Sequence, residues 1–145
     1  METKRIFKVL LVEDNRNDVI LTKEAFSNNG IECEMNVAKD GVEALDYLKK
    51  AKSGSFSKVP DMILLDLNLP KKNGKEVLEE LKKDERLKAI PVAILTTSSN
   101  ASDILDCYNL YANCYVTKSV DMAKFEDSIT QLKRFWLKTA ELPEV

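Results

Sequence analysis

Histidine is absent from this chain of 145 residues. Catalysis by Ser/His or Cys/His pairs and most zinc sites are therefore excluded, because each of them needs an imidazole. Cysteine is scarce, since Cys33, Cys107 and Cys114 are odd in number and form no Cys-x-x-Cys pair. This usage is typical of small buried side chains in a reducing compartment rather than of disulfides.

Long apolar runs and an excess of basic charge are also missing. No apolar stretch approaches the ~20 residues that a membrane span requires, and Met1 to Arg5 is too short and polar to begin a signal peptide. The net charge of −2 and the pI near 5.3 argue against a nucleic-acid-binding surface. We expect a cytoplasmic protein of one domain, residues 1–145 with a core of about 6–139, and no nucleic-acid or membrane partner.

What the chain does contain is a regular alternation of two patterns. The segments Phe7–Val12, Met62–Leu65 and Val92–Thr96 are short apolar runs, typical of strands covered on both faces. Two further strand candidates are shorter or alternate apolar and polar residues, at 113–117 and 31–37. Five intervening or following segments carry apolar residues at helical spacing. They are 15–30, 41–51, 75–83, 103–111 and 122–139.

This alternation predicts an α/β fold, a doubly wound five-stranded parallel sheet with helices on both faces. We expect the flavodoxin-like strand order 2-1-3-4-5, because segment 31–37 reads as an edge strand and Phe7–Val12 as an interior one. The last helix should bury one apolar face, made by residues at steps of three and four. These are Met122, Phe125, Ile129, Leu132 and Trp136.

Charged residues follow three of the predicted strands directly. Glu13 and Asp14 follow the first, Asp66 the third and Lys118 the fifth. The carboxyl ends of parallel strands meet at one edge of the sheet, so we expect these groups to lie together in a crevice, with Asp66 partly exposed. Two carboxylates at 4 Å repel by ~4 kcal/mol at an effective dielectric constant near 20. Mg²⁺ or Mn²⁺, with Lys118 as a second positive charge, would neutralise an all-oxygen cluster of this kind.

Such a site would suit phosphoryl transfer to a carboxylate. The metal and Lys118 would hold phosphoryl oxygens, the Thr96 hydroxyl would donate to another, and ionised Asp66 would attack phosphorus without a general base. The competing interpretation is an acidic surface patch with a salt-bridged lysine, in which Asp66 caps a turn and Thr96 is present for its strand propensity.

Five motifs stand at the predicted strand ends and helix starts. They are Leu-Val-Glu-Asp-Asn at 11–15, Asp-Gly-Val-Glu-Ala-Leu at 40–45, Leu-Leu-Asp-Leu-Asn-Leu-Pro at 64–70 with Gly74, Ile-Pro-Val-Ala-Ile-Leu-Thr at 90–96 and Tyr-Val-Thr-Lys at 115–118. Together these motifs resemble the receiver domain of two-component response regulators. Within that family, Leu-Asn-Leu-Pro-Lys-Lys-Asn-Gly at 67–74, Thr-Lys-Ser at 117–119 and Phe-Trp-Leu at 135–137 are most similar to the single-domain regulators of phytochrome-type histidine kinases.

The resemblance implies a role for each matching residue. Asp66 would be the phosphoacceptor, and Thr96, Lys118 and Tyr115 would be the switch hydroxyl, the phosphate-binding lysine and the switch aromatic. Tyr115 could equally be a packing residue of an edge strand. The metal ligands would be Glu13, Asp14, Asp66 and the main-chain carbonyl of Asn68, and the positions that influence the phosphoryl lifetime in this family are Asn68 and Ser98.

One position departs from the family pattern. Receivers usually follow the lysine with a proline through a cis bond, whereas Ser119 follows Lys118 here. A cis bond before serine would cost ~2.5–4 kcal/mol over trans, so we expect the loop after the lysine to take a different path.

The expected function is that of a single-domain response regulator without an output domain. It would accept a phosphoryl group from a sensor histidine kinase such as a bacteriophytochrome, and signal through a changed surface of helix four, strand five and helix five. It would catalyse only its own phosphorylation and dephosphorylation. Phe135, which cannot share the core face with Trp136, and Tyr111 are candidate homodimer contacts, against ordinary aromatic packing.

Three alternatives stay open from the sequence. An aspartyl-phosphate phosphatase or phosphotransferase would keep a second acid two residues after the nucleophile, where this chain has Asn68. A binding module independent of phosphorylation would not need the full set of site residues. A flavin-binding protein of the same topology would need a phosphate-cradling loop after strand one, where Glu13 and Asp14 have the wrong charge.

Overall fold

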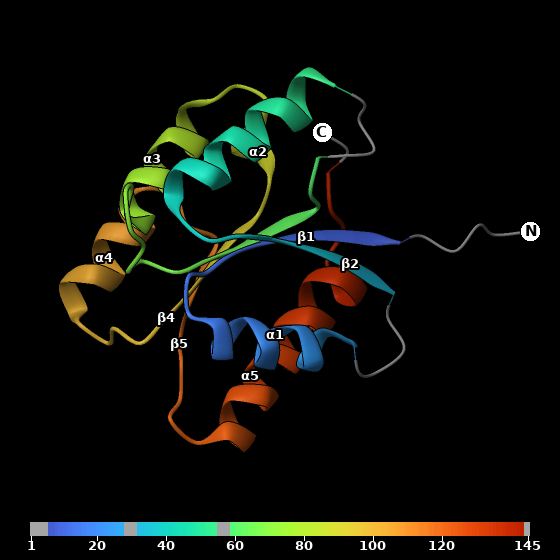
Figure 1. The fold of residues 1–145 in the computed structure, drawn as a ribbon, viewed down its shortest axis with the longest axis vertical. Coiled ribbons are helices and arrows are strands. Elements are labelled where there is room, and N and C mark those ends of the chain that lie inside the picture. Colours follow the sequence, from blue (N-terminus) through green and yellow to red (C-terminus); the bar gives the residue numbers. More distant parts are fainter. Residues whose placement is uncertain (1–5, 28–31, 55–58, 144–145) are drawn as a thin grey trace, which may run out of the picture.

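A computed structural model describes residues 6–27, 32–54 and 59–143. Five parallel strands form one sheet in the order β2-β1-β3-β4-β5, which confirms the predicted topology (Figure 1). The strands are β1 Phe7–Val12, β2 Cys33–Ala38, β3 Met62–Leu65, β4 Val92–Thr96 and β5 Cys114–Thr117. The α-helices are α1 Arg16–Ser27, α2 Gly41–Ser53, α3 Gly74–Lys83, α4 Ala101–Asn109 and α5 Met122–Arg134.

Two apolar layers cover the sheet. Helices α1 and α5 pack on one face, and α2, α3 and α4 lie on the other (Figure 1). Every residue of β3 and β4 is buried, because these central strands have a helical layer on both sides. Strands β2 and β5 at the edges are mostly half-buried. The continuous apolar runs therefore identify the centre of the sheet and the alternating run its edge, as predicted.

Side chains at the loop ends fix where three helices begin. Asp40 accepts a hydrogen bond from the Glu43 amide at 2.8 Å, and Asp121 accepts from the first turn of α5. Asn73 and Glu76 form a reciprocal capping box at the start of α3. Each cap accepts hydrogen bonds from amides that the helix cannot pair internally. These polar residues therefore determine where the helices begin, next to the carboxyl ends of the strands, where the predicted site lies.

The helices lie where the sequence predicted them, but some residues of their predicted apolar faces are not buried. Phe125, Ile129 and Leu132 are buried in α5 as predicted, whereas Met122 is 65% exposed, so its placement in the core was wrong. Met122 is the first residue of the helix, and periodicity defines a face without defining how far a helix extends beyond the core. The helix continues as a π-helical segment, Phe135–Thr139.

The helical stripe expected in segment 103–111 included Leu105 and Tyr108. Both are exposed in α4, and the buried residue of this helix is Cys107. The predicted stop of the first helix at Gly30 lies outside the described residues. Within the described part of the chain, no helix has the length and apolar character needed to cross a membrane.

Candidate functional site

Main-chain hydrogen bonds continue the sheet into the residues that follow three strands. The amide of Glu13 donates to Ala38 O at 2.9 Å, that of Asp66 to Val12 O at 3.1 Å, and that of Lys118 to Thr96 O at 2.6 Å. Each site residue is therefore held against a neighbouring strand rather than placed on a free loop. In the register of the parallel sheet Val12 pairs with Leu65 and Thr96 pairs with Thr117, so the residues that follow these strands, the two acids and the lysine, lie at one edge.

The predicted acidic cluster is present. Glu13, Asp14 and Asp66 each offer a carboxylate oxygen, and these oxygens lie within 4.8 Å of one another. Glu13 and Asp66 are buried, whereas Asp14 is exposed at the rim. A set of hard oxygen donors that is open on one side fits Mg²⁺ or Mn²⁺, because these ions prefer oxygen ligands and Mg²⁺ usually keeps several waters.

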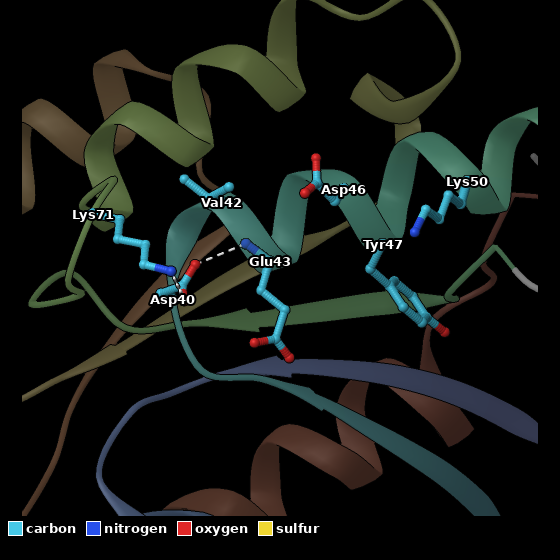
Figure 2. A pocket seen from close by; sticks show the side chains of 7 residues that line it. All are labelled: Asp40, Val42, Glu43, Asp46, Tyr47, Lys50 and Lys71. Atoms are coloured by element: carbon cyan, nitrogen blue, oxygen red, sulfur yellow. Dashed lines mark hydrogen bonds and ion pairs between the residues drawn. The ribbon is translucent and has the colours of Figure 1, made fainter.

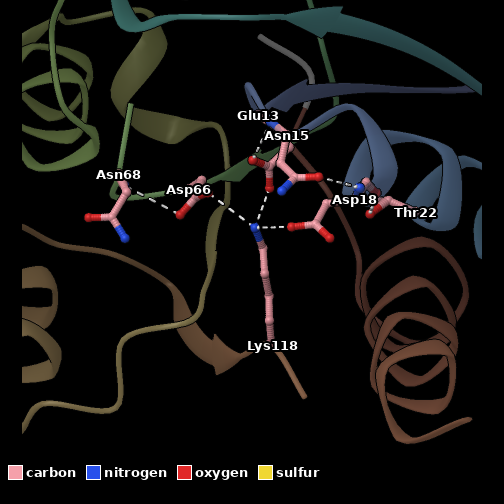
Figure 3. A network of polar contacts seen from close by, with 7 residues as sticks. All are labelled: Glu13, Asn15, Asp18, Thr22, Asp66, Asn68 and Lys118. Carbon is pink, nitrogen blue, oxygen red and sulfur yellow. Dashed lines mark hydrogen bonds and ion pairs between the residues drawn. The ribbon is translucent and has the colours of Figure 1, made fainter. Parts of the chain in front are cut away.

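Lys118 extends into this cluster from the end of β5 (Figure 3). Its Nζ lies 3.1 Å from Asp66 Oδ2 and 2.8 Å from Asp18 Oδ2, and it also donates to Glu13 Oε1. Burial disfavours the ammonium, but its hydrogen bonds to Asp18 and Glu13 outweigh that effect and raise the pKa of Lys118. The lysine is thus a permanent positive charge beside the predicted phosphoacceptor.

A single ammonium does not neutralise the acids around it. Burial raises the pKa of Glu13 to about 7, the negative charge of Asp66 acts in the same direction, and the hydrogen bond from Lys118 opposes both. Without a further cation, Glu13 therefore competes for a proton near neutral pH. The acids thus carry more negative charge than Lys118 compensates. This excess of negative charge, like the oxygen donors, fits a divalent metal ion.

Asp66 is more enclosed than the sequence suggested. We expected it to be partly exposed, but it is buried. The Asn68 amide donates to Asp66 Oδ1 at 3.3 Å, and the Gly74 amide donates to Leu67 O at 2.9 Å. A Cβ on Gly74 would lie 2.2 Å from the main-chain oxygen of Asp66, so only glycine lets the start of α3 approach the residue after β3 this closely.

Thr96 ends β4 beside these groups and is fully buried. Among the residues that the structure describes, its hydroxyl has no hydrogen-bond partner. A buried hydroxyl without a partner is costly, so its presence at the site edge calls for an explanation. A phosphoryl oxygen on Asp66 would supply an acceptor there.

Tyr115 and Ser98 connect β5 to the loop that follows β4. The Tyr115 hydroxyl donates to Ser98 O at 2.8 Å while the ring packs against the core. Ser98 Oγ in turn donates to Asp103 Oδ2 at 2.5 Å, and Lys75 Nζ donates to Asp103 Oδ1 at 2.7 Å. Lys75 also pairs with Asp106 at 2.9 Å. The predicted switch aromatic is therefore linked through the β4–α4 loop to both α3 and α4.

The lysine is followed by an ordinary peptide bond. No cis peptide bond occurs in the described residues, so the bond between Lys118 and Ser119 is trans. The Ser119 hydroxyl accepts from the Asp121 amide at 3.1 Å, which leads the chain into the cap of α5. Despite the departure from the family pattern, Lys118 reaches the predicted acids.

Sequence reasoning missed Asp18 and Lys75. Asp18 lies four residues after Asp14, in the first turn of α1, and an acid this close to the predicted cluster could have indicated that its carboxylate reaches the same rim. No local signal identifies Lys75, whose partners Asp103 and Asp106 are about thirty residues away. Its role depends on the packing of α3 against α4.

A separate hollow of about 390 Å³ lies along α2 (Figure 2). It is lined by Asp40, Val42, Glu43, Asp46, Tyr47, Lys50 and Lys71. Lys71 pairs with Asp40 at 3.5 Å, and a Cβ on Gly41 would lie 2.1 Å from Lys72 O. The hollow is thus bordered by the contact between the start of α2 and the loop before α3, and it shares no lining residue with the acidic cluster.

The comparisons with known proteins agree with this geometry. Residues 9–130 match the response regulator receiver domain family. Response regulator Rcp1 of Synechocystis sp. is 42% identical over 135 residues, which are 93% of this chain and 92% of Rcp1. The crystal structure of the phosphorylated cyanobacterial phytochrome response regulator RcpA aligns with a TM-score of 0.90 and 45% identity, covering 96% of this chain and 99% of RcpA.

A metal-bound relative is also similar. The Mn²⁺-bound form of Rcp1 aligns with a TM-score of 0.87 and 40% identity, covering 94% of this chain and 99% of that one. The family match spans the chain from β1 into α5 and so includes all the elements that carry the acids, the hydroxyl and the lysine. The chain belongs to the response regulator receiver domain family.

Proposed function

We propose that Asp66 accepts a phosphoryl group from the phosphohistidine of a sensor histidine kinase. The observation that carries this proposal is the position of Asp66 Oδ2, 3.1 Å from the Lys118 ammonium in an acidic cluster at the strand ends. A carboxylate oxygen of Asp66 attacks phosphorus and the P–N bond breaks. The imidazole leaves and takes a proton from solvent, and the product is an acyl phosphate.

The surrounding residues bind the transferred group. Lys118 donates to a phosphoryl oxygen, and the Thr96 hydroxyl, which lacks a partner among the described residues, donates to another. Glu13, Asp14, Asp66 and the Asn68 carbonyl hold Mg²⁺ or Mn²⁺, which when bound neutralises charge on the phosphoryl oxygens. Asn68 and Ser98 tune the lifetime of the acyl phosphate.

The activity we propose is limited to the protein's own phosphoryl group. Asn68 stands two residues after Asp66, at the position where an aspartyl-phosphate phosphatase carries its acid/base carboxyl group, which argues against turnover on external substrates. The output is then an interaction with a partner. The cytoplasmic location and the single-domain organisation expected from the sequence stay predictions.

The surface that responds comprises α4, β5 and α5. Movement of Thr96 toward a phosphoryl group would shift the end of β4 and the following loop, in which Ser98 accepts from Tyr115. Asp103 and Lys75 transmit that shift to α4 and α3 through their ion pair. A phosphoryl group biases this two-state element only by contacts that differ between the two states.

The kinase partner in this proposal is a phytochrome-type light-sensing histidine kinase. The support is the similarity to RcpA, which is described as a cyanobacterial phytochrome response regulator, at 45% identity over nearly the whole chain. Transfer from a phytochrome-type kinase, compared with transfer from an unrelated histidine kinase at equal concentration, tests this assignment. Equal rates from both kinases would contradict it.

We also propose a homodimer through the α5 face. Phe135 is 52% exposed, and it borders a hollow of about 360 Å³ between β5 and α5 that Cys114, Leu132 and Trp136 also line. Tyr111, in the turn between α4 and β5, is 75% exposed. Large exposed aromatic side chains of this kind are enriched in interfaces. A monomer mass independent of concentration in both phosphorylation states would refute the dimer.

The central test is the intact mass of the protein with Mg²⁺ and acetyl phosphate. We expect one added phosphoryl group on the parent and none on Asp66→Asn, which keeps the side-chain shape and removes the nucleophile. Omission of Mg²⁺ should abolish labelling of the parent. Labelling of Asp66→Asn at the parental rate would show that another residue is the acceptor.

A further inference from the structure

Asp18 is held firmly in the first turn of α1. Its amide donates to Asn15 Oδ1 at 3.1 Å, and its carbonyl accepts from the buried Thr22 hydroxyl at 2.7 Å. The carboxylate of Asp18 points away from both and toward Lys118, with Oδ2 2.8 Å from Nζ (Figure 3). A helix N-terminus favours a carboxylate in any case, but this one is directed at the lysine beside the phosphoacceptor.

The number of carboxylates that contact Lys118 equals the number of N–H donors on its ammonium group. An ammonium group carries three N–H bonds, and Lys118 donates to Glu13, Asp18 and Asp66. A phosphoryl group on Asp66 adds acceptor oxygens that also require this ammonium. With one carbonyl oxygen and three terminal phosphoryl oxygens on a phosphorylated Asp66, the acceptors around Lys118 outnumber its three N–H donors, so at least one of its present hydrogen bonds opens.

Burial decides which carboxylate is released at the lowest cost. Asp66 stays next to the lysine through its phosphoryl group, so the choice is between Asp18, whose side chain is 24% exposed, and Glu13, whose side chain is 2% exposed. An exposed carboxylate regains water when its ion pair opens, whereas a buried one is left without a partner. Glu13 is also a ligand in the proposed metal site. Asp18 is thus the partner that Lys118 can leave.

The geometry points to Asp18 as a positioning residue that holds Lys118 before phosphorylation and releases it to the phosphoryl group afterwards. This inference rests on the proposed phosphorylation of Asp66. Because the Asp18 pair must open for the phosphorylated state to form, it restrains phosphorylation, and it makes the first turn of α1 sensitive to the state of Asp66.

The test compares Asp18→Asn with the parent in labelling by acetyl phosphate at saturating Mg²⁺. We expect the variant to be labelled about threefold faster, since a partly exposed ion pair no longer competes for the lysine. Glu24→Gln is the matched control, because it removes one exposed negative charge from the same helix about 9 Å farther along the axis. It should leave the rate unchanged.

A second measurement needs no variant. In the parent labelled with ¹³C at aspartate Cγ, addition of Mg²⁺ and beryllium fluoride, a mimic of the phosphoryl group, should shift the Asp18 resonance as its ion pair opens. A rate for Asp18→Asn equal to or below that of the parent, or an unshifted Asp18 resonance, would overturn this inference alone. Failure of the parent to take up any phosphoryl group would overturn the proposed function and this inference with it.

Discussion

The turn after α4 places a bulky residue where glycine is usual. The Ala112 amide donates to Cys107 O at 2.9 Å and the Tyr111 amide to Tyr108 O at 3.0 Å, a Schellman arrangement that closes the helix. Tyr111 has the left-handed φ of 70° that this arrangement requires. In the left-handed conformation the Cβ of any residue other than glycine lies too close to the following carbonyl oxygen. We therefore predict that Tyr111→Gly stabilises the protein.

The size of the effect follows from three contributions. Relief of the left-handed conformation gains ~1–2 kcal/mol. The more flexible unfolded chain of the glycine variant offsets about 0.4–1 kcal/mol of this. Little packing is lost, because the Tyr111 side chain is 75% exposed. The free energy of unfolding should therefore rise by about 1 kcal/mol, and the Tm by about 3 °C.

Thermal and urea unfolding at low protein concentration, where dimers do not contribute, measure this change. Tyr108→Gly is the matched control, since it makes the same substitution inside α4, where glycine costs about 1 kcal/mol. The two variants should therefore shift the midpoint in opposite directions. A lower midpoint for Tyr111→Gly would mean that the turn is not strained and would refute the reasoning.

Two further predictions concern the acid cluster and its cover. Mg²⁺ affinity of the metal-free protein should fall about tenfold from pH 8 to pH 6 by isothermal titration, because the pKa of Glu13 is raised to about 7 and the metal needs the ionised carboxylate; a flat profile would contradict this. Gly74→Ala should lower the free energy of unfolding by about 1–3 kcal/mol and slow labelling of Asp66, since the new Cβ would lie 2.2 Å from Asp66 O. The control is Gly54→Ala, whose Cβ would have its nearest contact at 3.3 Å. It should lower the free energy of unfolding, measured in urea, much less than Gly74→Ala does, and equal losses for the two variants would refute the argument.

The sequence predicted the sheet well because local pattern and burial coincide there. Strand β3 is apolar throughout and buried throughout, and strand β2 alternates and lies at the edge. A parallel sheet needs both features, since central strands have helices on both faces. The position of Asp66 followed from the same pattern, because a charge directly after a buried strand lies at the carboxyl end of the sheet.

Burial at helix ends was less predictable. Met122 fits the apolar period of α5 but is exposed, because the period says nothing about how far the first turn extends beyond its neighbours. The enclosure of Asp66 was also missed. Its carboxylate contacts Lys118, which is 52 residues away in the sequence, and no local pattern specifies the geometry of such a contact.

Contacts with several distant parts of the chain determine the position of Lys118. Ser119 replaces the proline that usually follows this lysine, so the residue after it gives no rigid guide to the lysine's place. The Lys118 amide is instead fixed to Thr96 O at 2.6 Å, and its ammonium is fixed by carboxylates from the ends of β1 and β3 and from α1. Because these contacts come from four different elements, the lysine keeps its place without depending on any one loop. The same contacts make it responsive, since new negative charge on Asp66 would redistribute the three hydrogen bonds of the ammonium and thereby affect the ends of β1 and β3 and the first turn of α1.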